Sequence, residues 1–496
     1  MTKTKNAVKI TNLDNVGVAL ENIKPGEHIL DIEAKDAIPT GHKIALSDIA
    51  SGENIIKYGS PIGHATQAIF QGEHIHTHNI KTNLGGIEDY TYTPEAVALY
   101  PKNTPTTFMG YERPNGQVGI RNEIWIINTV GCVNKIAERI ANQAEKKHAA
   151  NQKIDGIYTF VHPYGCSQLG DDHKFTQQIL KGMVNHPNAA GVVVLGLGCE
   201  NNHIDDFKKI LGNWDENRVK FLNTQDVTDE IEAGLNAIDE LVAYASQFER
   251  KQIPVGKLIL GLKCGGSDGF SGITANVLVG SLSDYVIDQG GTCILTEVPE
   301  MFGAETLLMN RAKDETIFNK TVDLVNEFKR YFIRYGQEIY ENPSPGNKEG
   351  GISTLEEKSL GCTQKGGNSY VIDVLNYGET VKKPGLNLLQ GPGNDIVAVT
   401  NLMAAGAHIV LFTTGRGTPL GGPTPTVKIS SNTALSKNKS HWIDFDAGEL
   451  LDGTPLNELT EKFFNYLIDV ASGKTVTKNE ENGYREIAIF KDGVTL

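Results

Sequence analysis

Residues 123–132 read EIWIINTVGC, an apolar, β-rich run that stops at a glycine and a cysteine. The same arrangement recurs in three further segments, YTFVHPYGC (158–166), VVVLGLGC (192–199) and LILGLKCGG (258–266). A helical pattern follows each run, and the spacing from Cys132 to Cys166 and on to Cys199 is nearly even, close to one βαβ unit. Open parallel sheets bind ligands at the carboxyl ends of their strands. The pattern therefore predicts several soft, metal-capable side chains along one edge of an α/β fold.

The composition limits the classes of protein to consider. The 496 residues exceed one ordinary core, so more than one domain is expected. The net charge of −14 disfavours nucleic acid or a membrane surface as the main partner. The opening MTKTKNAVKI lacks an apolar signal core and no apolar run reaches membrane-spanning length, so we expect a cytoplasmic protein. In that compartment the six cysteines are expected as free thiols or metal ligands.

The fold class expected from the pattern is multidomain α/β, with a small all-β module first. Residues 1–90 hold short β-type runs separated by glycine-bearing turns, and the proline-bearing stretch 91–110 reads as a linker. From 111 to 250 strands and helices alternate, which is typical of a parallel sheet covered on both faces. After a boundary near Pro254, residues 254–496 repeat that alternation and predict a second α/β domain with a largely parallel sheet.

Three histidines alternate in EHIHTHN, at His74, His76 and His78. On a strand, a period of two points all three side chains to one face. Neutral imidazoles that converge in this way bind iron, manganese or zinc. The alternative is a polar strand face with solvated histidines.

The loops around Cys166 and Cys199 carry further polar groups, including His162, His173 and Glu200. A carboxylate or imidazole beside a metal ligand can transfer a proton. A small cysteine also packs well at a strand end without any function, so the site interpretation depends on the recurrence of the pattern.

The glycine-rich loops GLKCGGSDGFSG and TTGRGTPLGGP can hold anions on backbone amides. Neither matches the dinucleotide or P-loop fingerprint in its strand–helix context. Carboxylate recognition is expected from side chains in these loops: Arg416, Lys263, Ser267 and Asp268.

Taken together, GEHIHTHN, YGCSQLGDDH, HPNAAGVVVLGLGCENN, KCGGSDGFSGITAN, LTEVPEMFGAE, SLGCTQKGG and TTGRGTP make the chain resemble the altronate and galactarate dehydratase family of sugar-acid dehydratases over essentially its whole length. SLGCTQKGG, HWIDFDAGE and AIFKDGVTL look like the altronate-specific members. The resemblance implies an N-terminal β-clip domain of the SAF type and two α/β domains. It also implies a homodimer that uses a divalent metal, iron(II) first and manganese(II) second, and no membrane or nucleic-acid partner.

The reaction implied by the resemblance is dehydration of D-altronate to 2-dehydro-3-deoxy-D-gluconate in hexuronate breakdown. A divalent cation would stabilise the enediolate formed when the C2 proton leaves. The expected metal ligands are His74, His76, Cys132, Cys166 and Cys199. The expected acid–base residues are Glu200, His162 and His173, with Arg416 on the substrate carboxylate and Lys263, Ser267 and Asp268 beside it.

Three other functions remain open at this stage. A dehydratase for galactarate or another aldonate would differ only in substrate. An NAD-linked oxidoreductase on a doubly wound sheet lacks its phosphate fingerprint here. A non-catalytic protein that binds sugar acids would produce no 2-keto acid.

Overall fold

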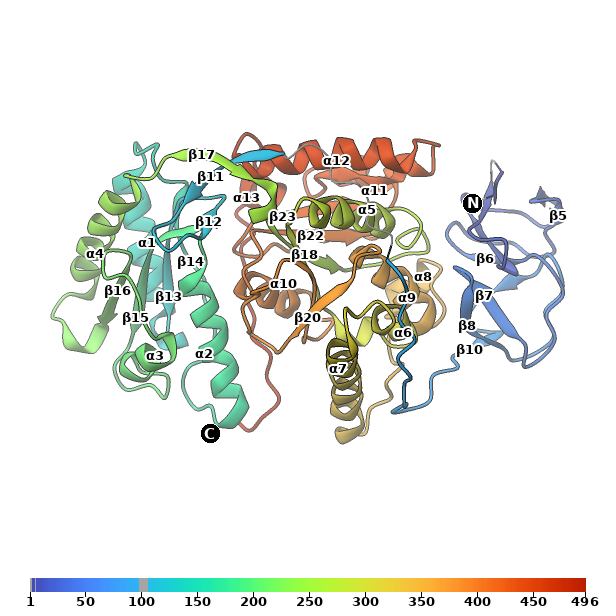
Figure 1. The fold of residues 1–496 in the computed structure, drawn as a ribbon, viewed down its shortest axis with the longest axis horizontal. Coiled ribbons are helices and arrows are strands. Elements are labelled where there is room, and N and C mark those ends of the chain that lie inside the picture. The colour runs from blue at the N-terminus through green and yellow to red at the C-terminus, as the bar shows by residue number, and fades with distance from the viewer. Residues whose placement is uncertain (1, 5, 98–105) are drawn as a thin grey trace.

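The computed structural model describes residues 2–4, 6–97 and 106–496. Three bodies follow one another along its long axis (Figure 1): the N-terminal module, the C-terminal α/β domain in the middle, and the other α/β domain at the far end. The order in space thus differs from the order in sequence. Among the described residues, no helix is both long and apolar enough to cross a membrane.

The N-terminal module is all-β, as the turn spacing predicts. A five-stranded antiparallel sheet runs β1 (Thr2–Lys3), β2 (Ala7–Lys9), β3 (Val16–Ala19), β6 (Lys43–Ala45) and β9 (His74–Ile75). Beside it lie a three-stranded sheet of β10 (Ile80–Lys81), β8 (Ser60–Ala65) and β7 (Asn54–Lys57), and a hairpin of β4 (His28–Ile29) and β5 (Ile32–Glu33). Isoleucine, valine and alanine fill the space between the strands, as β-branched residues do on pleated surfaces.

A small antiparallel sheet joins the two α/β domains. It pairs β12 (Val118–Gly119) with β11 (Thr107–Glu112), and β11 with β17 (Arg250–Pro254). Residues 107–110, expected as the end of the linker, therefore belong to strand β11. Residues 98–105 of that linker lie outside the described residues.

The domain between β11 and β17 is a four-stranded parallel sheet in the order β14 (Gly156–Thr159), β13 (Glu123–Asn128), β15 (Ala189–Gly196), β16 (Val219–Asn223). Helices α1 (Asn134–His148) and α4 (Glu230–Ala245) pack on one face, and α2 (Gly170–Asn185) and α3 (Ile204–Leu211) on the other. Because both faces are covered, the central strand β15 is buried along its whole length.

The C-terminal domain has a seven-stranded, entirely parallel sheet. Its order is β20 (Val371–Leu375), β21 (Gly385–Leu389), β19 (Thr292–Leu295), β18 (Ile259–Cys264), β22 (Ile409–Thr414), β23 (Thr426–Ser430), β24 (Phe445–Asp446). The helices around it are α5 (Ala275–Asp288), α6 (Glu305–Met309), α7 (Glu315–Arg334), α8 (Pro345–Glu349), α9 (Leu355–Cys362), α10 (Asp395–Ala404), α11 (Thr433–Asn438), α12 (Leu456–Ala471) and α13 (Lys478–Glu481).

Strand order in this sheet reverses at β18. The chain moves from β18 to β19 and β21 on one side, and β22, β23 and β24 lie on the other. Doubly wound sheets bind ligands in the crevice at such a reversal, beyond the carboxyl ends of the two diverging strands. The topology therefore marks the loops after Cys264 and Thr414 as the place to search for a site.

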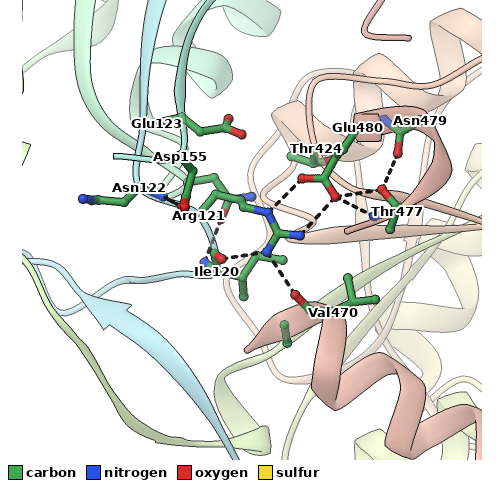
Figure 2. Close-up of polar contacts among 12 residues, drawn as sticks. Ile120, Arg121, Asn122, Glu123, Asp155, Thr424, Val470, Thr477, Asn479 and Glu480 are labelled. Carbon is green, nitrogen blue, oxygen red and sulfur yellow. Dashed lines mark hydrogen bonds and ion pairs between the residues drawn. The ribbon is translucent and has the colours of Figure 1, made fainter. Parts of the chain in front are cut away.

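A buried ion pair connects the two α/β domains (Figure 2). The Arg121 guanidinium donates from Nε to Glu480 Oε1 at 2.8 Å and from Nη2 to Oε2 at 3.0 Å. Its Nη1 donates to the backbone carbonyls of Ile120 and Val470. With four of its five N–H groups donating to fixed acceptors, this arginine holds one domain against the other.

The N-terminal module docks on the C-terminal domain of the same chain. Lys43 and Lys57, both buried in the module, donate from Nζ to the Glu357 carboxylate on α9 at 2.8 and 2.7 Å. The approach is close: a Cβ on Gly269 would lie 2.0 Å from the carbonyl oxygen of Gly41. Only glycine fits at that contact. Gly269 in the loop KCGGSDGF is therefore needed for docking of the module as well as for the turn.

Candidate active site

A pocket of about 660 Å³ opens at the strand reversal, between the module and the C-terminal domain. This volume lies within the range of small-molecule sites. Its lining includes Thr40, Gly41, Asp268, Glu349, Arg416 and Asn432. A second pocket of about 470 Å³ beside α5 has acidic residues and no basic one in its described lining, which disfavours an anionic ligand there.

Two residues expected to bind substrate, Arg416 and Asp268, line the first pocket. Arg416 is half-exposed and donates from Nη2 to Glu349 Oε2 at 2.9 Å. Asp268 is buried and accepts hydrogen bonds from the hydroxyls of Ser271 and Ser431. Burial raises the pKa of Asp268 above its ordinary value, although these hydrogen bonds oppose the shift.

Asp268 also lines a cavity of about 10 Å³, which has room for about one water. Ser267 and Cys362 share this lining. The buried hydroxyl of Ser267 has no hydrogen-bond partner, so it is available to a bound group. The pocket and this cavity thus share a wall at Asp268.

A buried group of two thiols and a carboxylate lies at the end of β18. Cys264 Sγ is 2.9 Å from Glu300 Oε2 and 3.3 Å from Cys362 Sγ, and Cys362 Sγ is 3.2 Å from Glu300 Oε2. Their three donor atoms all lie within 4.8 Å of one another, so this group can hold a metal ion. The hydrogen bond to Cys264 and burial raise the pKa of the Cys362 thiol well above its ordinary value.

Lysines balance the carboxylates around this group. Burial alone would raise the pKa of Glu300, but the ammonium groups of Lys358, Lys263 and Lys365 hold it well below its usual range. Lys263, expected to bind substrate, is buried and paired with Glu297 and, at 2.8 Å, with Asp395. Its charge is therefore already compensated within the protein.

Glu297 has a backbone φ of 69°, in the left-handed region. Its Oε2 accepts from the backbone N–H of Cys264 at 2.9 Å, which holds the glutamate in place. Such a conformation in a residue other than glycine costs about 1–3 kcal/mol and clusters at functional sites.

Imidazoles gather where the module meets α8. The ring centroids of His42 lie 5.1 Å from His74 and 4.7 Å from His76, and those of His74 and His76 are 5.7 Å apart. The expected strand is short, because β9 ends at Ile75. The rings nevertheless converge, since the turn after β9 returns His76 and His78 toward His74.

Hydrogen bonds assign the tautomers of these rings. His42 Nε2 lies 3.1 Å from the Glu349 carbonyl oxygen, so it carries the proton and leaves Nδ1 as an acceptor. His74 Nε2, 3.0 Å from His42 Nδ1, must then donate. His76 Nε2 donates to the Lys348 carbonyl at 2.8 Å. His74 and His76 therefore each have an unprotonated Nδ1, and that of His76 accepts from Thr77 Oγ1 at 3.1 Å. A ligating histidine normally donates its other N–H in this way.

Burial is the main cause of the low pKa of both rings. It lowers the pKa of His74 to about 3, aided by repulsion from His42, and that of His76 to about 4, aided by Lys43. Both imidazoles are consequently neutral at physiological pH, the form that binds metal.

The three other expected metal ligands lie on the α/β domain between β11 and β17, which we call the far domain. Cys132, Cys166 and Cys199 are exposed and follow β13, β14 and β15. The C-terminal domain separates those strands from the module along the long axis (Figure 1). The structure therefore divides the expected ligand set into an imidazole group and a thiol group that cannot share one ion within a chain.

Two of the three expected acid–base residues have all their described polar atoms engaged. Glu200 Oε1 accepts from Thr129 Oγ1 at 2.5 Å and its Oε2 from the Gly198 amide at 2.7 Å. Burial would raise the pKa of Glu200, but these hydrogen bonds lower it, which makes a weak base. His162 donates from Nε2 to the Asn128 carbonyl and accepts the Tyr164 N–H at Nδ1. Both residues hold the loops of the far domain.

His173 differs from them, because its Nδ1 is buried and has no hydrogen-bond partner. It is the fourth residue of the sixteen in α2, on the same far domain. Burial, with Lys491 nearby, lowers its pKa. All three expected acid–base residues are thus remote from the pocket that contains Arg416.

Three family models match the chain in order. "Altronate/galactarate dehydratase SAF domain" matches residues 5–83, "D-galactarate dehydratase/Altronate hydrolase, second domain" matches 110–246, and "D-galactarate/Altronate dehydratase, C-terminal" matches 255–495. An altronate dehydratase of Bacillus subtilis (strain 168) is 55% identical over 497 residues, covering 99% of this chain and all of that protein.

The chain belongs to the altronate and galactarate dehydratase family. An Escherichia coli (strain K12) altronate dehydratase is 53% identical over 99% of both chains. The galactarate dehydratase (L-threo-forming) of the same strain is 32% identical, over 99% of this chain and 97% of its own. The SAF expectation for the N-terminal module is confirmed.

Sequence reasoning missed two features of this dehydratase family member. His42 was not expected in the imidazole group, because it is 32 residues before His74 and no local pattern links them. Cys362 and Glu300 were not joined to Cys264 for the same reason. The sequence did contain a signal for the buried group of Cys264, Glu300 and Cys362. Cys264 lies at the end of an apolar run, as the other three loop cysteines do.

Proposed function

We propose that this protein is a metal-dependent hydro-lyase that converts D-altronate to 2-dehydro-3-deoxy-D-gluconate and water. The observation that carries the proposal is the 55% identity to an altronate dehydratase across the full length of both chains. The interdomain pocket supports it, because the pocket combines a guanidinium for a carboxylate with polar groups for hydroxyls.

Binding begins with the substrate carboxylate on Arg416. This side chain is half-exposed and bonded on one side only to the exposed Glu349, so the carboxylate replaces a weak surface contact. Asn432 and Thr40 line the same pocket and supply hydrogen bonds for the hydroxyls. Fixing both ends of the substrate sets which carbon faces the proton acceptor.

We place the metal on Nδ1 of His74 and Nδ1 of His76. The fit rests on the tautomers: each ring donates Nε2–H to a fixed acceptor and keeps Nδ1 unprotonated. Iron(II) is the expected ion and manganese(II) the substitute, both of which accept imidazole and oxygen ligands. When bound, the ion supplies Lewis acidity to the substrate carboxylate.

The compact group of Cys264, Glu300 and Cys362 has suitable donor atoms for a metal, but the substrate cannot reach it. All three side chains are buried, and the cavity of about 10 Å³ that Cys362 lines has room for about one water, which is too small for a sugar acid. We assign this group to the wall of the site.

Asp268 is our choice for the group that accepts the C2 proton. It lies on the pocket wall, and burial raises its pKa above the ordinary value, which makes it a stronger base than an exposed aspartate. Glu200, His162 and His173 take part only if a second subunit of the expected homodimer brings its far domain to this pocket.

The test is turnover by metal-stripped protein under anaerobic conditions. Iron(II), manganese(II) or zinc(II) is restored, D-altronate or galactarate is added, and 2-keto acid is measured. We expect product from altronate with iron or manganese. Product from galactarate alone would support the second candidate, which the 32% identical relative motivates. No keto acid from either sugar acid would refute the dehydratase proposal.

A further inference from the structure

Three cysteines of the far domain follow three neighbouring strands. In the sheet order β14, β13, β15, Cys166 lies in the loop after the first strand, Cys132 after the second and Cys199 after the third. Carboxyl ends of parallel strands meet at one edge, so the three thiols belong to one edge of one sheet. The imidazole and acid–base groups of the proposed reaction use none of them.

Hydrogen bonds lock the three loops together. The Gly131 N–H donates to the Tyr164 carbonyl at 2.8 Å, and the Asn202 N–H donates to the Gly165 carbonyl at 2.9 Å. The Asn202 side chain also donates to the Thr129 carbonyl at 3.1 Å, which links the first loop to the third. The edge is therefore a preformed structure.

Glycine is required for this close approach. A Cβ on Gly165 would lie 2.0 Å from the Thr129 carbonyl oxygen, and one on Gly131 would lie 2.7 Å from that of His162. Each of these glycines directly precedes a cysteine, Cys166 and Cys132. The glycines thus allow the backbones to meet, and an exposed cysteine follows each point of contact in the chain.

The thiols are accessible and unbonded to one another. Cys132, Cys166 and Cys199 are free and exposed, whereas the three remaining cysteines, Cys264, Cys293 and Cys362, are free and buried in the C-terminal domain. Free cysteine is among the most buried residue types, so three exposed thiols at one edge need an explanation.

Unsatisfied polar atoms accompany them. Among the described residues, the side-chain oxygens of Asn128 and Asn202 and Nδ1 of His173 are buried without a hydrogen-bond partner. Asn128 ends β13, Asn202 follows Cys199 by three residues, and His173 is in the first turn of α2. Such atoms cost free energy unless a bound group uses them.

The spread of the thiols selects the kind of ligand. Among the described residues, the only group of three or more metal-binding side chains with all donor atoms within 4.8 Å is the buried one of Cys264, Glu300 and Cys362. The three exposed thiols therefore do not all lie within that distance of one another, so a ligand that joins them has to span more than a compact single-ion group does. Thiolates select iron–sulfur clusters among the larger inorganic groups.

We propose that Cys132, Cys166 and Cys199 hold an iron–sulfur cluster of the [4Fe–4S] type. Two ferrous, two ferric and four sulfide ions assemble into a core of charge +2, and the three thiols each lose a proton to bind it, for a total charge of −1. No cysteine of the described structure remains at this edge for the fourth iron. That iron keeps an open position, which takes an oxygen ligand such as a hydroxyl or carboxylate.

The start of α1 favours this charge. Cys132 lies in the short turn Gly131–Val133 that leads directly into α1. The unpaired N–H groups of a helix start favour a nearby anion. The cluster site and the imidazole site lie on separate domains, so either proposal can fail without the other.

The test uses the full chain, reconstituted anaerobically with ferrous and ferric iron in equal amounts and with sulfide, then desalted. We expect iron and acid-labile sulfide in equal amounts, near four of each per chain, with broad visible absorbance. Cys132→Ser, Cys166→Ser and Cys199→Ser should each lose most of the sulfide. Cys293→Ser is the control, because Cys293 lies in the core of the C-terminal domain, on a different sheet, and its thiol donates to the Ser283 carbonyl.

Thermal unfolding checks that the serine variants are folded, which their exposure favours. Iron bound without sulfide would refute the cluster and indicate a single ion. Equal sulfide in the unchanged chain and in the triple serine variant would also refute it. Loss of sulfide in the three variants and its retention in Cys293→Ser would establish the site.

Discussion

His42 Nδ1 and His74 Nε2 lie 3.0 Å apart, and this contact sets the protonation of a chain of groups that ends at the carbonyl oxygen of Glu349. The last carbonyls of a helix lack partners within the helix, so α8 offers acceptors at its end. His42 uses one of them and so orients His74. The module and the C-terminal domain thus build the imidazole group together.

The first prediction concerns metal binding by this group. His76→Ala removes a proposed ligand and should abolish tight manganese(II) binding, measured by calorimetry. His42→Ala removes only the partner that orients His74 and should weaken binding by roughly 10–100-fold. His64→Ala is the control in the same module, because His64 bonds to Asn83 and not to the group. Unchanged affinity in His76→Ala would contradict the assignment.

The second prediction concerns the carboxylate contact. Arg416→Ala should raise the KM for D-altronate by roughly 10–100-fold, since a charge-assisted hydrogen bond contributes about 1.5–3 kcal/mol. Arg416→Lys should be intermediate, because lysine keeps the charge and loses the planar fork. Arg330→Ala, on the exposed side of α7, is the control. A KM unchanged in Arg416→Ala would place the carboxylate elsewhere.

The third prediction concerns docking of the module. Glu357→Gln leaves Lys43 and Lys57 buried without their counter-charge. Breaking a buried pair in this way costs about 3–5 kcal/mol, enough to loosen the interface. Limited trypsin digestion should release the N-terminal module faster than in the unchanged protein, while Glu53→Gln, on the exposed surface of the module, should behave as unchanged. Equal release rates in all three proteins would show that docking does not depend on this charge.

The fourth prediction is a pH dependence of stability from Glu480. Burial alone would raise its pKa, but Arg121 and Arg485 lower it to about 2. Because the folded pKa lies below the ordinary value of about 4.3, this pair stabilises the fold above that pH. Its contribution of about 3 kcal/mol is lost as the pH falls from there toward the folded value.

Urea unfolding of the unchanged protein and of Glu480→Gln measures this contribution. Their difference in unfolding free energy should be large at neutral pH and shrink as the pH falls below the ordinary value. Glu327→Gln, from an exposed pair with Arg330, should show a difference of at most about 1 kcal/mol at every pH. A constant difference for Glu480→Gln would contradict the assigned pKa.

Much of the fold is predictable from local pattern. The apolar runs before Cys132, Cys199 and Cys264 are buried parallel strands, and the long amphipathic segment after Asp314 is helix α7. The spacing of apolar residues and the turn residues at each end determine such elements, because both signals come from neighbours a few residues apart. The all-β module and the two parallel sheets followed from the same signals.

The site was predictable only in parts. The alternation of His74, His76 and His78 indicated converging imidazoles, and Arg416 was placed correctly in a loop at a strand end. Which groups meet across domains was not predictable, because His42 and Glu349 are 307 residues apart and meet only through docking. We expected histidine and cysteine ligands to form one site. In the structure, the histidines and the three cysteines lie on different domains.

The most direct test of the account is anomalous X-ray scattering at the manganese edge from crystals of the manganese(II) protein with D-altronate. The account predicts a manganese peak beside Nδ1 of His74 and His76, with the altronate carboxylate on Arg416. A peak at the buried Cys264, Glu300 and Cys362 group, or altronate bound away from Arg416, would contradict it.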